Sequence, residues 1–115
     1  MENLKLDGFN AKNIFELKIK TLRSLNVEGS QNISINSDIE SSLKKLILPY
    51  NNISKSLLKL PQLEYLDNNF PSSIDFNSLN NLKKIKFHLG VVFGQILAIK
   101  SLKEIHITSF DLDYL

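Results

Sequence analysis

Apolar residues recur along this chain with one spacing, which is clearest near the middle of the sequence. Leu43, Leu46 and Leu48 stand at the first, fourth and sixth places of this pattern, with Asn51 at the ninth and Ile53 at the eleventh. Because side chains alternate along a strand, the fourth and sixth places share one face. Asn side chains hydrogen-bond backbone groups at turns, which suits the ninth place. The pattern predicts a short strand with one buried face, followed by a turn.

The same pattern recurs along the whole chain at nearly equal steps. The predicted repeats start at Met1, Leu22, Leu43, Leu63, Leu82 and Leu102, so successive starts are 21, 21, 20, 19 and 20 residues apart. The fourth places hold Leu4, Leu25, Leu46, Leu66, Ile85 and Ile105. In four repeats a further apolar residue stands three places before the start: Ile19, Leu60, Leu79 and Ile99. A fixed period of about 20 residues predicts a solenoid in which each repeat stacks on its neighbours.

This pattern resembles the leucine-rich-repeat family, in its short form of about 20–21 residues per repeat. The resemblance covers essentially all of residues 1–115. It implies an α/β fold class: a right-handed solenoid with a parallel β-sheet on the concave face and irregular, 3₁₀ or short helical segments on the convex side. The chain would be a single domain of about six repeats, or part of a longer array.

The register of the fourth repeat is open to two interpretations. A start at Leu63 keeps the period but places Asn68 at the sixth, apolar place. A start at Leu60 fits the apolar places better and puts Tyr65 in the core, but it leaves only 17 residues (43 to 60) for the third repeat. We adopt Leu63 because the shorter repeat falls below the usual length of this class. If Leu63 rather than Leu66 lies beside Leu46, the other register is correct.

The segments between the predicted strands are about ten residues long. We expect the first strand at residues 4–6, with a turn that Gly8 allows, and a loop with a few apolar anchors at residues 32–42. Residues 95–102 lack Pro and Gly, so a full helical turn is most favoured there. The ninth places outside the third repeat hold Phe9, Ser30, Pro71, Gly90 and Phe110. An internal Asn ladder is therefore not expected, and backbone or water would satisfy the turns.

Composition is ordinary for a single globular domain. Apolar residues make up 43% of the chain, charged residues 23%, and the net charge is +2, too small to indicate nucleic-acid binding by itself. The chain has no cysteine, so the cysteine-rich caps common in extracellular members of the family are missing, which favours a cytoplasmic location. No apolar run approaches the roughly 18 residues of a membrane span, and the first residues do not resemble a signal peptide.

Candidate chemistry is sparse. The sequence contains no glycine-rich phosphate loop and no H-E-x-x-H metal motif. His88 and His106 fall in adjacent repeats with Asp67 one repeat away, so a metal site is conceivable, but two solvated histidines are the favoured interpretation. We therefore expect no enzyme activity, no catalytic residues, no cofactor and no small-molecule substrate.

The predicted concave face offers a candidate site for another protein. Exposed aromatic and apolar residues rimmed by charge are typical of such sites. The predicted partner-binding residues are Ile47, Tyr50, Tyr65, Phe70, Lys84, Lys86, His88, Leu89 and His106. The surrounding lysines are Lys44, Lys45, Lys83, Lys84 and Lys86. In the alternative interpretation, Tyr50, Phe70 and Leu89 pack locally over the turns.

Other roles compete with partner binding. A nucleic-acid partner is disfavoured because acidic residues share the face with the lysines: Asp7, Glu28, Glu64, Asp67 and Glu104. The chain could instead be a structural or regulatory segment of a larger protein whose activity lies elsewhere. Because Met1 and Leu112 occupy apolar places of the first and last repeats, end-to-end self-association is also conceivable.

Overall fold

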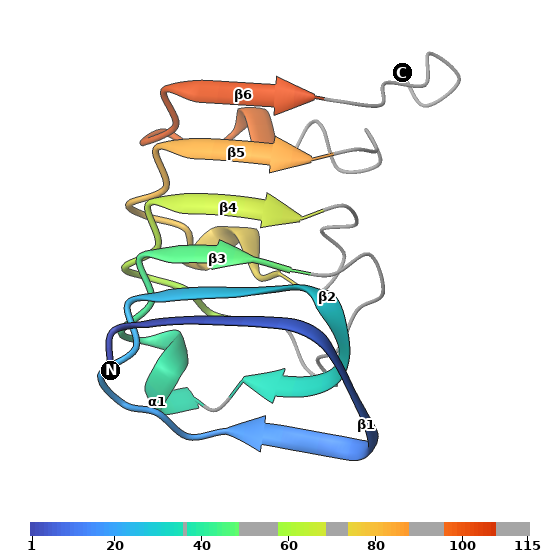
Figure 1. Ribbon diagram of the computed structural model, residues 1–115. Coiled ribbons are helices and arrows are strands. Elements are labelled where there is room, and N and C mark those ends of the chain that lie inside the picture. Colours follow the sequence, from blue (N-terminus) through green and yellow to red (C-terminus); the bar gives the residue numbers. More distant parts are fainter. Residues whose placement is uncertain (36, 49–57, 69–73, 88–95, 108–115) are drawn as a thin grey trace.

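Parallel strands lie side by side in one sheet, in the order in which they occur along the chain (Figure 1). The structure is a computed structural model that describes residues 1–35, 37–48, 58–68, 74–87 and 96–107. Within these residues the strands are β1 (Asn3–Leu17), β2 (Ser24–Ile35), β3 (Lys45–Ile47), β4 (Tyr65–Asn68), β5 (Lys84–Phe87) and β6 (Glu104–Ile107). The order β1 to β6 without any crossover is that of a solenoid, in which each coil adds one strand.

The register of the sheet follows the predicted repeats. Across the pairs β1–β2 to β5–β6, the residues in register at the fourth place are Leu4, Leu25, Leu46, Leu66, Ile85 and Ile105. Leu46 lies beside Leu66, so the fourth repeat starts at Leu63 and the alternative start at Leu60 is wrong. Leu25, Leu46, Leu66 and Ile85 are fully buried, whereas Leu4 and Ile105 at the two ends are partly buried. The predicted column is therefore confirmed, and its residues are most completely buried in the middle of the sheet.

A backbone ladder marks the start of every strand after β1. The carbonyl oxygen at the second place of each repeat accepts hydrogen bonds from two successive N–H groups of the next repeat. For example, Arg23 O accepts from Lys44 N at 2.8 Å and Lys45 N at 3.0 Å, and Lys44 O accepts from Glu64 N at 2.8 Å and Tyr65 N at 3.0 Å. Paired backbone groups of this kind fix the stacking of one coil on the next.

Side chains at the position just before the second, third and sixth repeats form a second ladder. Thr21 Oγ1 donates to the carbonyl of Met1, Ser42 Oγ to that of Leu22 at 2.8 Å, and Ser101 Oγ to that of Leu82 at 2.7 Å. In the fifth repeat Asn81 Nδ2 donates to Pro61 O at 2.7 Å. Sequence reasoning missed this ladder, although short polar residues do recur at this place with the period of the repeat.

The core lies between the sheet and the segments that return from one strand to the next. The fully buried side chains from the strands, such as Leu25 and Phe87, form one cluster with Leu58, Ile74 and Ile96 from the returning segments. The apolar places three residues before the repeat starts also face this cluster: Leu60, Leu79 and Ile99 are buried and Ile19 is partly buried. Burying each large aliphatic side chain stabilises the fold by roughly 1.5–3 kcal/mol.

The first two strands are much longer than expected and fold back on themselves (Figure 1). After irregularities between Lys5 and Phe15, β1 and β2 pair again in their second arms, where Phe15 lies beside Ile33 and Leu17 beside Ile35. The prediction of a short first strand and of a loop from residue 32 is therefore wrong. The alternation of apolar and polar residues over residues 32–35 is a strand signal, and Ile33 and Ile35 are buried.

Two glycines lie in the region where the arms bend. Gly8 has a φ of 73°, a left-handed conformation that residues with a Cβ rarely adopt, but it lies within β1 and not in the predicted turn. Gly29 lies beside Asp7 in the register of the sheet. A Cβ atom at Gly29 would meet the carboxylate of Asp7, so a larger residue here would have to displace that exposed side chain.

In the part of the chain that the structure describes, helical structure is confined to short pieces on the side away from the open face of the sheet (Figure 1). The α-helix α1 (Ser37–Glu40) and the 3₁₀ helix η2 (Phe76–Ser78) each make about one turn. Ile96 and Leu97 are also helical, within the segment expected to form a helical turn. Asp75 caps η2 by accepting the backbone N–H of Asn77 at 3.1 Å.

Candidate open-face site

The third and fifth places of each repeat point away from the core and form the open face of the sheet. This follows from alternation, because they flank the buried fourth place on the same strand. Lys45 and Ile47 flank buried Leu46, for instance, with Lys45 exposed and Ile47 half-buried. From β3 to β6 the open face carries Lys45, Ile47, Tyr65, Asp67, Lys84, Lys86, Glu104 and His106.

Five of the nine predicted partner-binding residues lie together on this face. Ile47, Tyr65, Lys84 and Lys86 are half-buried and His106 is exposed. Since the start of the fourth repeat is Leu63, Tyr65 belongs to the open face and not to the core. The other predicted residues, Tyr50, Phe70, His88 and Leu89, lie outside the described residues. Their predicted place on the same face, or over the turns, stays a prediction.

Tyr65 occupies the centre of the open face, between two lysines. The register places Lys45 of β3 on one side of Tyr65 and Lys84 of β5 on the other. The ammonium group of Lys45 lies over the ring at 5.2 Å from its centroid, and that of Lys84 at 5.7 Å. Both distances fall within the roughly 6 Å over which a ring face attracts a cation. Lys45 is one of the predicted surrounding lysines but not one of the predicted partner-binding residues.

Ion pairs line the edge of the sheet where the strands begin. Lys83 Nζ lies 3.2 Å from Glu64 Oε1, and Lys84 Nζ lies 3.3 Å from Glu104 Oε2. All four side chains are at least 38% exposed, so each pair contributes at most about 1 kcal/mol to stability. These pairs do more to position the side chains on the surface than to hold the fold together.

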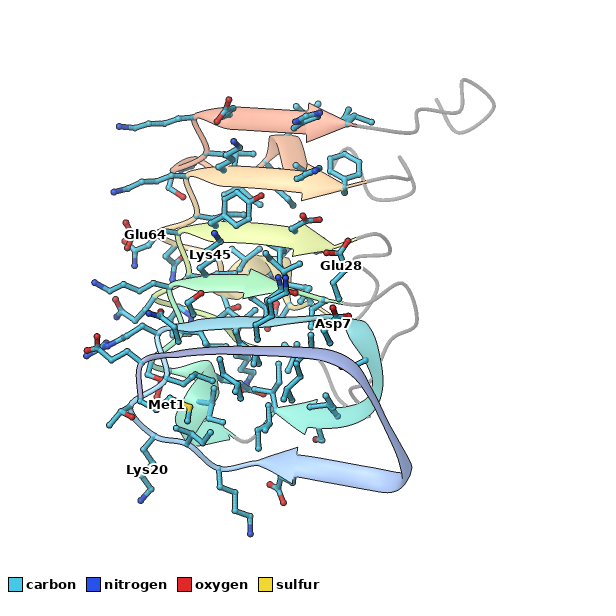
Figure 2. The ribbon with its side chains drawn as sticks, in the orientation of Figure 1. Met1, Asp7, Lys20, Glu28, Lys45 and Glu64 are labelled. Carbon is cyan, nitrogen blue, oxygen red and sulfur yellow. The ribbon has the colours of Figure 1, made fainter. Side chains whose placement is uncertain are left out.

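Acidic side chains gather at the opposite end of β1 and β2. Figure 2 shows Asp7 and Glu28 near each other there, away from Lys45 and Glu64. The backbone N–H of Glu28 donates to Asn26 Oδ1 at 3.1 Å, which fixes the chain just before the bend of β2. The open face therefore has an acidic corner at β1 and β2 and a lysine-rich centre over β3 to β5.

Ser30 provides the kind of contact expected from the ninth-place Asn. Its side chain is buried, and its Oγ donates to the carbonyl oxygen of Leu6 at 2.9 Å. Buried polar groups need such partners, and a serine hydroxyl can replace an Asn amide in donating to one carbonyl. The expectation that backbone or water alone satisfies the turns outside the third repeat is therefore wrong for this repeat.

Among the acidic groups of the described residues, Glu40 is the one whose pKa the fold changes clearly. It stands three places before Leu43, where the neighbouring repeats carry apolar residues. Burial raises the pKa of the Glu40 carboxyl, because the charged form loses solvation, while a hydrogen bond from the Lys59 backbone and the Lys59 charge partly offset the rise. Glu40 lies on the returning segment and not on the open face, so it belongs to the packing of the coil.

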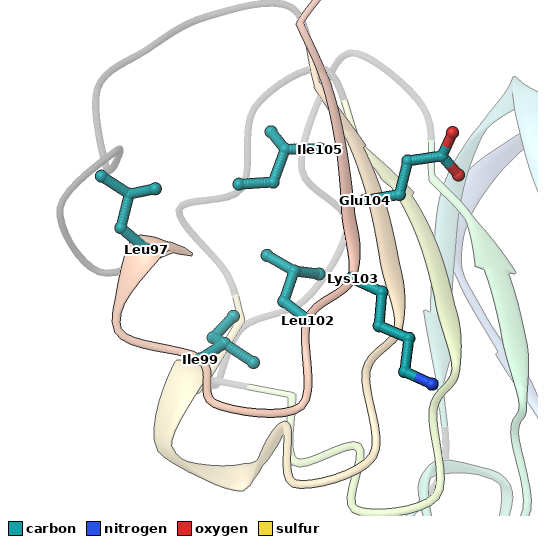
Figure 3. A pocket seen from close by; sticks show the side chains of 6 residues that line it. All are labelled: Leu97, Ile99, Leu102, Lys103, Glu104 and Ile105. Atoms are coloured by element: carbon teal, nitrogen blue, oxygen red, sulfur yellow. The ribbon is translucent and has the colours of Figure 1, made fainter.

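A second surface feature is a hollow on the last coil. It is lined by Leu97, Ile99, Leu102, Lys103, Glu104 and Ile105 (Figure 3). Leu97 is 59% exposed, and Leu102 and Ile105 are only partly buried against the core. This apolar surface is the one on which a further coil of a solenoid would stack.

Comparison of the chain with known protein families, with curated proteins and with solved structures found no match. The described residues include no helix long and apolar enough to cross a membrane. Within the same residues, no three His, Asp or Glu side chains gather closely enough to hold a metal ion. The suggested pairing of His88 with His106 is not tested by this, since His88 lies outside the described residues.

Proposed function

We propose that this chain is a non-catalytic module of the leucine-rich-repeat type that binds a protein partner on its open face. The observation that carries the proposal is the half-buried pair Ile47 and Tyr65 at the centre of a regular strand surface, framed by lysines. Neither side chain belongs to the buried core. An aromatic and an aliphatic side chain on an otherwise charged surface are typical of residues that a partner covers.

The repeat pattern supports the family assignment within this proposal. The six starts, the buried fourth places and the hydrogen bond of the ninth-place Ser30 all follow the spacing of short leucine-rich repeats. We propose the right-handed coil of that family and take the open face to be its concave side. Lys84 and Glu104 of the face form a surface ion pair, which suits recognition better than catalysis.

The hollow on the last coil favours a second candidate function. Leu97, Leu102 and Ile105 offer apolar side chains on the outer side of this coil. In this alternative the chain is a structural or regulatory segment of a larger repeat protein, and further coils cover the hollow. The two candidates differ in which surface meets the rest of the assembly.

Affinity capture with two matched variants separates the candidates. Ile47→Asn places a polar group on the open face, and Leu97→Asn makes the same type of change in the hollow. With the purified chain as bait in an extract of the source cells, mass spectrometry should show proteins that the unmodified chain and Leu97→Asn retain. Ile47→Asn should retain them about tenfold less, as expected for a residue at the centre of an interface.

The denaturation midpoints of both variants show whether they remain folded. Loss of the same proteins from Leu97→Asn but not from Ile47→Asn would instead favour the structural segment. If both variants retain what the unmodified chain retains, neither surface is the binding site, and the proposal is wrong.

A further inference from the structure

The central lysines of the open face carry more positive charge than their neighbours neutralise. Lys84 pairs with Glu104 at 3.3 Å, but no carboxylate of the described residues pairs with Lys45, whose neighbour is the Tyr65 ring at 5.2 Å. A ring face attracts an ammonium group without removing its charge. Lys45 and Lys84 therefore present two cations around one ring, and only one of them has an anionic partner among the described residues.

The ring also restricts where these cations lie. A lysine side chain on a surface ordinarily samples many rotamers, and ordering it costs up to about 2 kcal/mol of side-chain entropy. Here the sheet register places both lysines beside Tyr65, and attraction to the ring favours rotamers that hold the two ammonium groups over it. Figure 2 shows Lys45 extending from β3 toward the neighbouring strand β4. Part of the side-chain entropy that the two lysines would lose on binding an anion is therefore already lost in the free protein.

The surroundings select the kind of anion. Asp67 lies next to Ile47 in the register and Glu104 lies next to Lys84, so carboxylates flank the lysines on the same face. A nucleic acid carries closely spaced phosphates and would meet these carboxylates as well as the lysines. An acidic peptide segment, in contrast, can place separate carboxylates beside Lys45 and Lys84 on the two sides of the Tyr65 ring, and one of them can accept a hydrogen bond from the Tyr65 hydroxyl.

Ile47 adds an apolar contact at a fixed distance from Lys45 along β3. It stands two residues after Lys45 on β3, on the same face, and residues spaced in this way are about 7 Å apart along a strand. An extended peptide has the same spacing between residues i and i+2. A partner segment with an acidic residue and an apolar residue two places apart therefore matches the lysine–tyrosine cluster and Ile47 together.

We propose that Lys45, Tyr65 and Lys84 form a carboxylate-binding site for an extended acidic segment of a protein partner, with an apolar side chain of that segment on Ile47. This inference rests on the proposed function and names the chemistry of the partner. The two lysine ammonium groups bind carboxylates of that segment, one on each side of the Tyr65 ring, and the ring positions the ammonium groups. Attraction between these charges should weaken as salt screens it.

Nuclear magnetic resonance titration tests the site with defined probes. The first probe is a blocked peptide that repeats glutamate, serine, leucine and serine, and the second has glutamine in place of glutamate. The glutamate peptide should shift the side-chain signals of Lys45, Lys84 and Tyr65, and the glutamine peptide should bind about tenfold more weakly, as expected when a charge-assisted hydrogen bond is lost. A thymidine oligonucleotide serves as the third probe and should bind more weakly than the glutamate peptide.

Matched variants assign the effect to the site. Lys45→Gln and Lys84→Gln should each weaken binding of the glutamate peptide about tenfold. Lys18→Gln, which removes the same charge from an exposed position after β1, should leave it unchanged. Tyr65→Phe retains the ring face and should retain most of the affinity, whereas Tyr65→Leu should lose it together with the ordering of the lysine signals. The denaturation midpoint of each variant is measured in parallel.

Three results would overturn the inference. They are equal binding of the glutamate and glutamine peptides, no detectable binding of the glutamate peptide, and binding of the oligonucleotide as strong as that of the peptide. These results do not by themselves contradict partner binding on the open face. If captured proteins depend on Ile47 but remain bound to Lys45→Gln and Lys84→Gln, the carboxylate site is wrong and the proposed function stands.

Discussion

At the scale of single residues, Glu40 shows how the stacking of one coil on the next changes the burial and the pKa of a side chain. The corresponding places in the neighbouring repeats hold Ile19 and Leu60. Glu40 there is half-buried beside the backbone of Lys59, and burial raises its pKa above the ordinary value of 4.5. The folded chain therefore binds a proton at Glu40 more tightly than the unfolded chain does.

The raised pKa of Glu40 gives its contribution to stability a defined pH dependence. The favourable contribution is fully present below pH 4.5, the ordinary pKa, and is lost as the pH rises through the higher pKa of the folded state. Glu40→Gln removes this titration and keeps an oxygen that can accept the Lys59 N–H. At pH 7 we expect Glu40→Gln to have a higher denaturation midpoint than the unmodified chain, and the difference should shrink toward zero as the pH falls below 4.5.

The control for this prediction is Glu28→Gln, which makes the same change on the exposed part of β2. Equal midpoints of Glu40→Gln and the unmodified chain at pH 7, or a difference that does not change with pH, would contradict the role given to burial.

At the scale of elements, the sheet is a series of equivalent strands that differ in how many neighbours cover them. Leu46 of β3 lies between Leu25 and Leu66 and is fully buried. Leu4 of β1 has Leu25 on one side and is only partly buried. The same side chain at the same place of two repeats therefore makes different amounts of contact.

Truncating these two leucines compares the two environments. Leu46→Ala should lower the free energy of unfolding by about 2–5 kcal/mol, as removal of a buried Leu side chain does. Leu4→Ala should lower it clearly less, because less of its surface leaves water on folding. Chemical denaturation of both variants measures the two losses. Equal losses would mean that further contacts cover Leu4, for example those of a second copy of the chain.

At the scale of the whole molecule, stability should vary along the solenoid instead of being uniform. Nearest-neighbour stacking makes the central coils the best supported. The extensive pairing of the two arms of β1 with those of β2 adds support at the first end, whereas β6 packs beside the apolar hollow. We therefore expect a gradient that falls more steeply toward β6 than toward β1.

Equivalent backbone amides provide a matched measurement of this gradient. The third-place N–H groups of Ser24, Tyr65 and Glu104 each donate at 3.0 Å to a carbonyl of the previous repeat. Hydrogen exchange should be slowest at Tyr65, intermediate at Ser24 and fastest at Glu104, with about tenfold or more between the extremes. Equal protection of the three amides would mean that the coils unfold as one unit and that the gradient does not exist.

The sequence by itself determined the period, the parallel solenoid and the column of fourth-place residues outside the fourth repeat, whose start at Leu63 only the register of the sheet decided. These features follow from local rules, because alternation and a fixed repeat length leave few ways to bury the apolar face. The same rules placed Ile47, Tyr65, Lys84, Lys86 and His106 on the open face. The alternation at Ile33 and Ile35 was also present in the sequence, and was misread as a loop.

Only the tertiary structure decided which side chains meet across neighbouring coils. The cluster of Lys45, Tyr65 and Lys84 joins residues about 20 positions apart, and it forms because the register places all three at the third place of successive strands. The burial of Glu40 and the hydrogen bond of Ser30 to Leu6 likewise depend on the coil beside them. A local pattern indicates which face a residue occupies. The stacking of the coils determines its neighbours, and those neighbours determine its burial, its hydrogen bonds and its pKa.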